Sequence, residues 1–417
     1  MPPNDSGAQR NRPRESLRAH GASLALEAER PSGERMQPLR IAVIANMVDP
    51  NRVALFERVA RYDGVELLVV YETGMEADRS WRIPADLPYL HTLLRSASVD
   101  LRRLGTKAYL HVPLRPLGPI RSFQPDVVVA AGGGVWSSPA NIRAFAARKK
   151  EGWAFVPWWG SFRKARPSAA RRLSEPWVRH FLSHSDLCLA YGTRAARELE
   201  RLGVAPSAIR CVPNAVPHGE PIPRRRPHRP VRFLFVGRLL PLKGISELLE
   251  AFSQLGKGKL YIAGDGPLRS QVTRAVEGGR VTYAGQLDRP SLQRLYADSD
   301  VLVLPSHNDV WGLVINEALE HGLAVIATDA VGAVDDLVLD DLNGYVTRTG
   351  DVGELREAMA RIADWDEMRW RSAATTGAEI AERWSIDAAA SAFVDACRAS
   401  VEPRTQRERA HRLSHNH

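Results

Sequence analysis

The chain has 417 residues, of which 44% are hydrophobic and 25% charged, with a net charge of +9 and an isoelectric point near 9.7. This length predicts two globular domains, and three widely spaced cysteines argue against a disulfide framework or a zinc site and for a reducing compartment. No apolar run approaches the roughly 20 residues that span a bilayer, and no signal-peptide core is present, so we expect a cytoplasmic protein. The positive charge favours an anionic partner, which a nucleotide, a membrane surface or a nucleic acid would satisfy equally.

The first 216 residues predict a disordered leader followed by a parallel sheet. Residues 1–37 mix Pro, Gly, Ser, Arg and Glu with little periodicity, which is typical of disorder. In residues 38–216, short apolar runs alternate with helical patterns, as in a parallel sheet covered by helices. Residues 74–122, which are polar and punctuated by Pro and Arg, give no readable pattern. The expected strands are 39–45, 65–71, 126–131, 153–159, 187–191 and 209–213, and the expected helices are 53–60 and 193–202.

Two segments of this first domain have a structural and a functional interpretation of similar weight. Gly132, Gly133 and Gly134 follow a predicted strand, where they form either a simple turn or a place at which backbone N–H groups approach a ligand closely. Residues 161–180 carry six Arg and Lys among apolar side chains, which fits peripheral contact with anionic lipid on the inner face of a membrane. A solvated helix face on a basic protein fits at least as well, and Pro167 interrupts any single long helix.

A Pro- and Arg-rich segment, residues 217–230, separates the two domains. We interpret it as an exposed linker rather than a nucleic-acid site, because no aromatic platform or recognised nucleic-acid module accompanies its Arg run. The second domain is expected over 231–384, followed by a helix at 385–401 and a polar, disordered tail at 402–417. Its expected strands are 233–236, 260–263, 281–283, 301–304 and 323–327, and helices are expected at 245–253 and 351–363.

Residues 301–329 carry the most informative pattern of the second domain. A strand at 301–304 is followed by a polar loop, a helix that starts near Trp311 and ends before Gly322, and a second strand. Such a parallel unit points the positive end of its helix at the sheet edge where ligands bind, and Gly312 leaves room there for a phosphate. Two acids stand out, Asp309 and Glu317. Each also has an interpretation without function: Asp309 as a helix N-cap, and Glu317 as a solvated helix residue.

These two acids, with seven residues between them, make the chain resemble the retaining glycosyltransferases of family 4, which have two Rossmann-like domains facing across a cleft, the GT-B fold. In that family the first acid contacts the donor sugar and the second holds the ribose hydroxyls. Here Asp309 replaces the usual Glu, which keeps the charge and shortens the reach. The resemblance also assigns Arg238 and Lys243, which flank the turn at Gly237, to the donor diphosphate, so that no metal ion is required. It adds further donor-binding residues at Gly266, Gln286, Gly312, Leu313 and Val314.

The resemblance is strong over 231–350 and looser over 38–216. There, residues 46–58 with Arg79 and Trp81 are similar to a subgroup that glycosylates saccharides or lipid-linked saccharides, and the His usual after the fourth strand is replaced by residues 132–135. The implied function is transfer of a sugar, with retention, from a UDP-, GDP- or ADP-sugar to a saccharide, glycolipid or small-molecule hydroxyl, in polysaccharide or glycoconjugate biosynthesis. A nucleotide-sugar epimerase and a transferase-like binding subunit without chemistry are the alternatives.

A nucleic-acid binder ranks last among the functions considered, and a dehydrogenase is disfavoured because the first strand lacks a Gly-rich phosphate loop.

Overall fold

The computed structural model describes residues 37–73, 86–100, 109–131, 135–162, 169–217 and 227–414. Several expectations fall outside these ranges and are not tested: the leader at 1–36, most of the linker at 218–226, the Arg79 and Trp81 pair, the glycines at 132–134, and residues 163–168 of the basic segment. Within the described ranges, no helix combines the length and the apolar character that crossing a membrane requires.

The first domain is a seven-stranded parallel sheet with strand order β3-β2-β1-β6-β7-β8-β9. Its central strands are continuous apolar runs because helices cover both faces, so alternate side chains of β1 enter separate cores. The strands are β1 Leu39–Ala45, β2 Val65–Tyr71, β3 Leu90–Leu93, β6 Val127–Ala131, β7 Ala154–Trp159, β8 Cys188–Ala190 and β9 Ile209–Cys211. The helices are α1 Pro50–Ala60, α2 Gly118–Phe123, α3 Pro139–Glu151, α4 Ala169–Ser183 and α5 Thr193–Arg201.

The stretch that gave no readable pattern, residues 74–122, contains part of this sheet and a separate hairpin. Strand β3 adds to the edge beside β2, and β4 Ser96–Asp100 pairs antiparallel with β5 Tyr109–Pro113. Leu90 and Leu93 of β3 are 60% and 57% exposed, so this edge strand lacks the buried apolar alternation by which sequence patterns reveal strands.

The second domain is a six-stranded parallel sheet with strand order β12-β11-β10-β13-β14-β15. Strands that are distant in the chain are neighbours here, since β10 lies between β11 and β13. The strands are β10 Arg232–Val236, β11 Lys259–Ala263, β12 Val281–Gly285, β13 Val301–Leu304, β14 Ala324–Thr328 and β15 Gly344–Thr347. The helices are α6 Ile245–Leu255, α7 Arg269–Val276, α8 Arg289–Ala297, α9 Leu313–Glu320, α10 Val334–Leu337, α11 Val352–Ala363 and α12 Glu367–Arg383.

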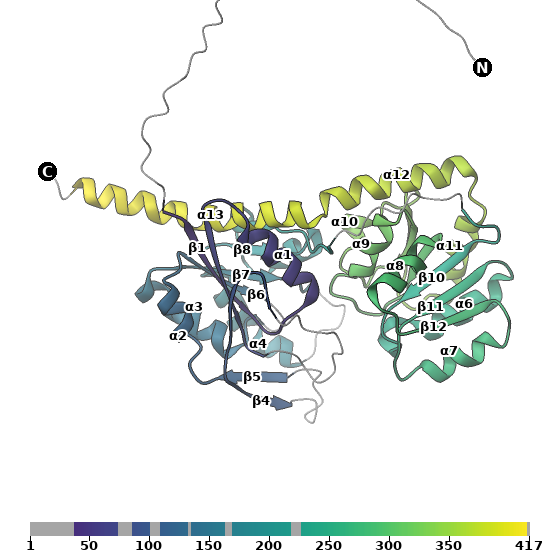
Figure 1. The fold of residues 1–417 in the computed structure, drawn as a ribbon, viewed down its shortest axis with the longest axis horizontal. Coiled ribbons are helices and arrows are strands. Elements are labelled where there is room, and N and C mark those ends of the chain that lie inside the picture. Colours follow the sequence, from purple (N-terminus) through teal and green to yellow (C-terminus); the bar gives the residue numbers. More distant parts are fainter. Residues whose placement is uncertain are drawn as a thin grey trace, which may run out of the picture. The chain divides into compact units, whose positions relative to one another are not determined.

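The last helix, α13 Ile386–Ser414, returns to the first domain, where it packs against α1 and strand β7 (Figure 1). Phe393 is fully buried in the core of the first sheet and its ring packs 5.5 Å from that of Trp158. The helix also corrects our expectation of a disordered tail at 402–417, because it continues to Ser414. The tail is rich in Arg and also contains Glu, Gln, Ala and Leu, all good helix formers, and extending an existing helix avoids the cost of nucleating a new one.

Candidate functional site

The candidate site lies at the carboxyl edge of the second sheet, where the loops after β10 and β13 are in direct contact. Gly244 has a φ of 71°, and a Cβ there would come within 1.9 Å of the backbone oxygen of Pro305. Gly266 is equally constrained, since its Cβ would lie 2.7 Å from the backbone oxygen of Leu239. Only glycine permits these approaches. The one at Gly244 brings the turn that carries Lys243 against the segment that carries Asp309, and the one at Gly266 brings the loop after β11 against the loop after β10.

Lys243 and Asp309 form an ion pair across this contact. The Lys243 ammonium donates to Oδ2 of Asp309 over 2.5 Å, and both side chains are only 18% exposed. Asp309 also forms an isolated bridge with Val331 in the loop after β14. The carboxylate therefore does not act as the helix N-cap: the N-cap of α9 is Gly312, and no side chain caps the helix. A pair this shielded from water holds the Lys243 ammonium at one place on the sheet edge.

Helix α9 begins at Leu313, directly after Gly312. Gly312 has a φ of 95° and its Cβ would lie 2.7 Å from Cγ1 of Val331, so the start of the helix is closely packed on the neighbouring loop. Because no side chain caps the helix, the amides of Leu313 and Val314 at its first turn present the positive end of the helix dipole without a protein anion. This arrangement suits a phosphate.

Glu317 occupies the second turn of the same helix and is held by Tyr296 of α8. The Tyr296 hydroxyl donates to Oε2 of Glu317 over 2.6 Å, and Tyr296 is 1% exposed. The His321 ring stacks on Tyr296 with 5.3 Å between centroids. Burial raises the pKa of the Glu317 carboxyl, while the Tyr296 hydrogen bond opposes that rise. Glu317 is therefore an oriented, partly buried acid rather than a solvated helix residue.

The remaining predicted residues lie on the loops that follow neighbouring strands of this sheet. Gly237 and Arg238 follow β10, Gly266 follows β11 and Gln286 follows β12. Arg238 and Gln286 have exposed side chains, and the Gly237 amide donates to the backbone oxygen of Ala263 over 3.0 Å. Since β10, β11, β12 and β13 are parallel neighbours, their carboxyl ends meet at one edge, and the structure brings all the predicted residues there.

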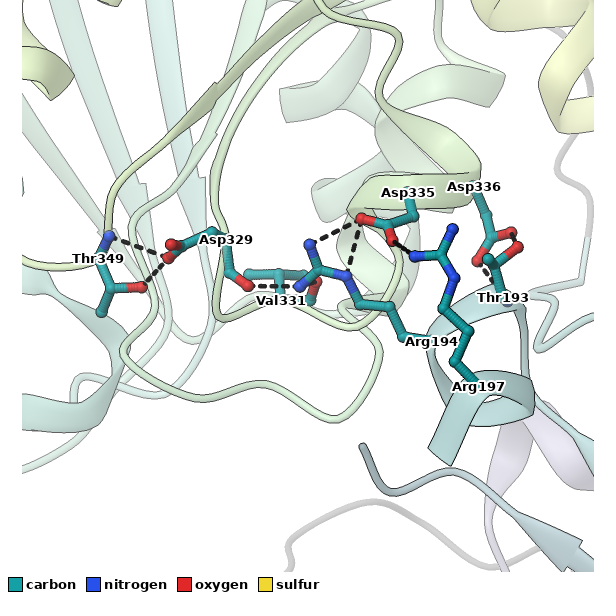
Figure 2. A network of polar contacts seen from close by, with 8 residues as sticks. All are labelled: Thr193, Arg194, Arg197, Asp329, Val331, Asp335, Asp336 and Thr349. Carbon is teal, nitrogen blue, oxygen red and sulfur yellow. Dashed lines mark hydrogen bonds and ion pairs between the residues drawn. The ribbon is translucent and has the colours of Figure 1, made fainter. Parts of the chain in front are cut away.

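Sequence reasoning missed the contacts by which the first domain meets this edge (Figure 2). The Thr193 amide donates to Oδ2 of Asp336 over 3.0 Å, and Arg194 and Arg197 donate to opposite oxygens of Asp335, each over 2.8 Å. Arg194 also donates to the backbone oxygens of Asp329 and Val331. The partners are separated by 135 to 143 residues in the chain, so no local sequence pattern predicts these contacts.

Trp311 links this interface to the candidate site. Its indole N–H donates to Oδ1 of Asn316 over 2.9 Å, and its ring packs 4.9 Å from Trp384, which precedes α13. Gly192 of the first domain leaves room for it, because a Cβ there would meet the Trp311 ring at 2.6 Å. Residues that follow β8 thus touch residues that follow β13 and β14, so the carboxyl edges of the two sheets face each other.

Two parallel sheets whose carboxyl edges face each other, with a closing helix that returns to the first domain, define a protein of the GT-B fold. Residues 230–364 match the family model of glycosyl transferases group 1. A solved structure of HepE from Anabaena in complex with UDP superposes with a TM-score of 0.63 at 16% identity, covering 86% of this chain and 99% of that one.

Two relatives in sequence are similar over longer stretches than the family model. The sulfoquinovosyl transferase SQD2 of Arabidopsis thaliana is 26% identical over 64% of this chain, which spans only 59% of that relative's length. The GDP-mannose-dependent alpha-mannosyltransferase of Mycolicibacterium smegmatis is 28% identical over 71% of this chain and 81% of its own. The second domain thus matches the glycosyl transferases group 1, and the chain as a whole is similar to glycosyltransferases of the GT-B fold.

Proposed function

We propose that this protein transfers a glycosyl group from a nucleotide-sugar donor to a hydroxyl of a saccharide, lipid-linked saccharide or small molecule, with retention and without a metal ion. One observation carries the donor site: the Lys243 and Asp309 pair precedes the start of helix α9, and the Tyr296-held Glu317 follows on its second turn, along one sheet edge. A cation, an uncapped helix N-terminus and an oriented acid in that order match a diphosphate followed by a ribose. The UDP bound by HepE and the GDP-mannose dependence of the mannosyltransferase support a nucleotide donor and leave its base open.

In this proposal the positive groups stabilise the charge that develops on the departing diphosphate. Lys243, Arg238 and the first-turn amides of α9 supply that stabilisation, and one well-placed donor of this kind contributes about 3 kcal/mol. Glu317, fixed by Tyr296, accepts hydrogen bonds from the ribose hydroxyls. Asp309 has two tasks, since it fixes the Lys243 ammonium and lies where the donor sugar would begin.

Retention is proposed to proceed on one face of the sugar. Retaining glycosidases use one carboxylate as nucleophile and a second as acid and base. Here both acids, Asp309 and Glu317, are assigned to binding the donor, so neither serves as the nucleophile. The leaving diphosphate oxygen would accept the proton of the acceptor hydroxyl as the new bond forms, so the acceptor attacks from the side that the nucleotide leaves. This step requires the diphosphate to stay in place, which the fixed Lys243 ammonium supports.

Nucleotide binding tests the proposal directly. The melting temperature is measured with UDP, GDP, ADP and their common sugar conjugates, for the wild type, for Glu317→Ala and for Glu357→Ala, an exposed acid on α11 that serves as a control. A nucleotide at about 100 times its dissociation constant adds roughly 2.7 kcal/mol of stability. We expect a shift with one base, retained in the control and lost in Glu317→Ala. If none of the nucleotides shifts the melting temperature of the wild type, the donor site is refuted.

Product analysis then separates the three alternatives. Donor alone yields a new nucleotide sugar if the protein is an epimerase, and donor with acceptor yields a glycoside of unchanged anomeric configuration if it is a retaining transferase. Binding with neither product would identify a transferase-like binding subunit.

A further inference from the structure

A pocket of about 410 Å³ lies where helix α5 of the first domain meets the loop after β14 and helix α10 of the second. Its size falls in the range of small-molecule sites. The walls include Phe162, Arg194, Arg197 and Arg201 from the first domain and Asp329 and Asp335 from the second. Figure 2 shows how Arg194 reaches across from α5 to the second domain beside it.

One wall of the pocket is joined directly to the candidate donor site. Arg194 donates to the backbone oxygen of Val331 over 3.2 Å, and Val331 forms a bridge with Asp309. The amide of Gly332 donates to the backbone oxygen of Asp309 over 3.0 Å. The pocket therefore borders the end of the site where the donor sugar begins, on the side that the first domain contributes.

The charges of the pocket balance. Three guanidinium groups, on Arg194, Arg197 and Arg201, are matched by the carboxylates of Glu198, Asp329 and Asp335. A site for a phosphate or another anion would hold an excess of positive charge. Matched donors and acceptors instead suit a neutral ligand with many hydroxyl groups, each of which both donates and accepts hydrogen bonds.

An aromatic ring completes the set. The Phe162 ring lies beside Gly332, where a Cβ would come within 3.2 Å of the Phe162 Cε1 atom, and the Arg194 guanidinium is 5.7 Å from the ring centroid. A sugar ring has an apolar face of C–H groups and an equator of hydroxyls. An aromatic side chain next to charged hydrogen-bonding groups complements both.

We propose that this pocket binds a sugar unit of the acceptor, so that the acceptor is a saccharide or carries one next to the hydroxyl that reacts. This inference rests on the proposed function and adds the class of acceptor to it. Because the walls come from both domains, an acceptor bound here would contact Arg194 and Asp335 together and so favour the arrangement in which the two sheet edges face each other.

The test measures the binding of maltose, cellobiose and diacetylchitobiose by saturation-transfer NMR, with the protein saturated in turn with UDP and with GDP. Three variants are compared with the wild type. Phe162→Leu keeps apolar volume and removes the ring, Arg197→Ala removes a guanidinium whose side chain is 68% exposed, and Glu200→Ala changes an exposed residue of the same helix outside the lining.

We expect at least one disaccharide to bind, with at least fivefold weaker binding in Phe162→Leu and Arg197→Ala and no change in Glu200→Ala. Binding that is equal in all variants, or no binding of any disaccharide to the wild type, would overturn the proposal. Binding of inorganic phosphate that Arg197→Ala abolishes would also overturn it, in favour of an anion site. The nucleotide-induced thermal shift is recorded on the same samples. If the wild type shows no such shift, the donor site is refuted, whereas the pocket is judged by disaccharide binding alone.

Discussion

The carboxyl edges of the two sheets hold different kinds of interaction. At the second sheet, the contacts are polar: Lys243 pairs with Asp309, and Tyr296 donates to Glu317. At the first sheet, Arg52 of α1 lies 3.8 Å above the ring of Trp158 and donates to the Tyr191 hydroxyl. The second edge positions charges for a ligand, whereas the first edge uses a cation to hold aromatic side chains in place. Substitutions at the two edges should therefore have separable effects on activity and on stability.

The largest expected effect is that of Lys243→Ala on turnover. Loss of the ammonium removes a stabilising charge near the leaving group, which corresponds to a fall in kcat of about 10²- to 10³-fold. The measurement is steady-state kinetics with the donor identified by the thermal shifts. Lys257→Ala is the matched control, because Lys257 also forms an ion pair, with Asp364, and is exposed in the same domain. Turnover that is equal in Lys243→Ala and the control would contradict the assignment.

Lys243→Ala also leaves the largely buried Asp309 carboxylate without its partner. The double variant with Asp309→Asn removes that unpaired charge, so it separates a loss of stability from a loss of charge at the diphosphate. We expect the double variant to recover stability and not turnover.

Arg52→Leu at the first edge should affect stability more than donor binding. It removes a cation above the Trp158 ring and a hydrogen bond to Tyr191, for an expected loss of about 2 kcal/mol in the free energy of unfolding. Urea unfolding measures that loss. Arg58→Leu on the same helix is the control, since its pair with Asp387 is exposed and contributes at most about 1 kcal/mol. A weakened nucleotide-induced shift in Arg52→Leu would show that the two edges are not independent.

The smallest expected effect is that of Tyr296→Phe on nucleotide affinity. The variant removes one hydrogen bond to the Glu317 carboxylate, so the affinity should fall about five- to tenfold, or about 1 to 1.4 kcal/mol. Calorimetric titration measures this fall. The corresponding 2′,3′-dideoxynucleotide lacks the hydroxyls assigned to Glu317, and its affinity should be nearly the same in both proteins. An equal loss for both ligands would mean that Tyr296 supports the fold of the site in general.

Much of the fold could be predicted from apolar runs that end at turn residues. The strands β1, β2 and β13 match the expected ranges at both ends, because each is buried on both faces and closed by polar or Pro residues. The exposed edge strand β3 and the hairpin of β4 and β5 could not be predicted, since the apolar pattern is missing or interrupted there. The length of α13 was also missed, because a polar composition fits a surface helix and a disordered tail alike.

The sequence by itself determined the two-domain fold class and the places of the candidate donor residues, because strand ends and helix starts are local features of the chain. Spacing also placed Asp309 before the start of α9 and Glu317 on its second turn. Only the tertiary structure decided the partners: Lys243 for Asp309, Tyr296 for Glu317, and Arg194 and Arg197 for Asp335. These pairs join residues 21 to 141 positions apart, and their contacts exist only once β10 lies beside β13 and the two sheet edges face each other.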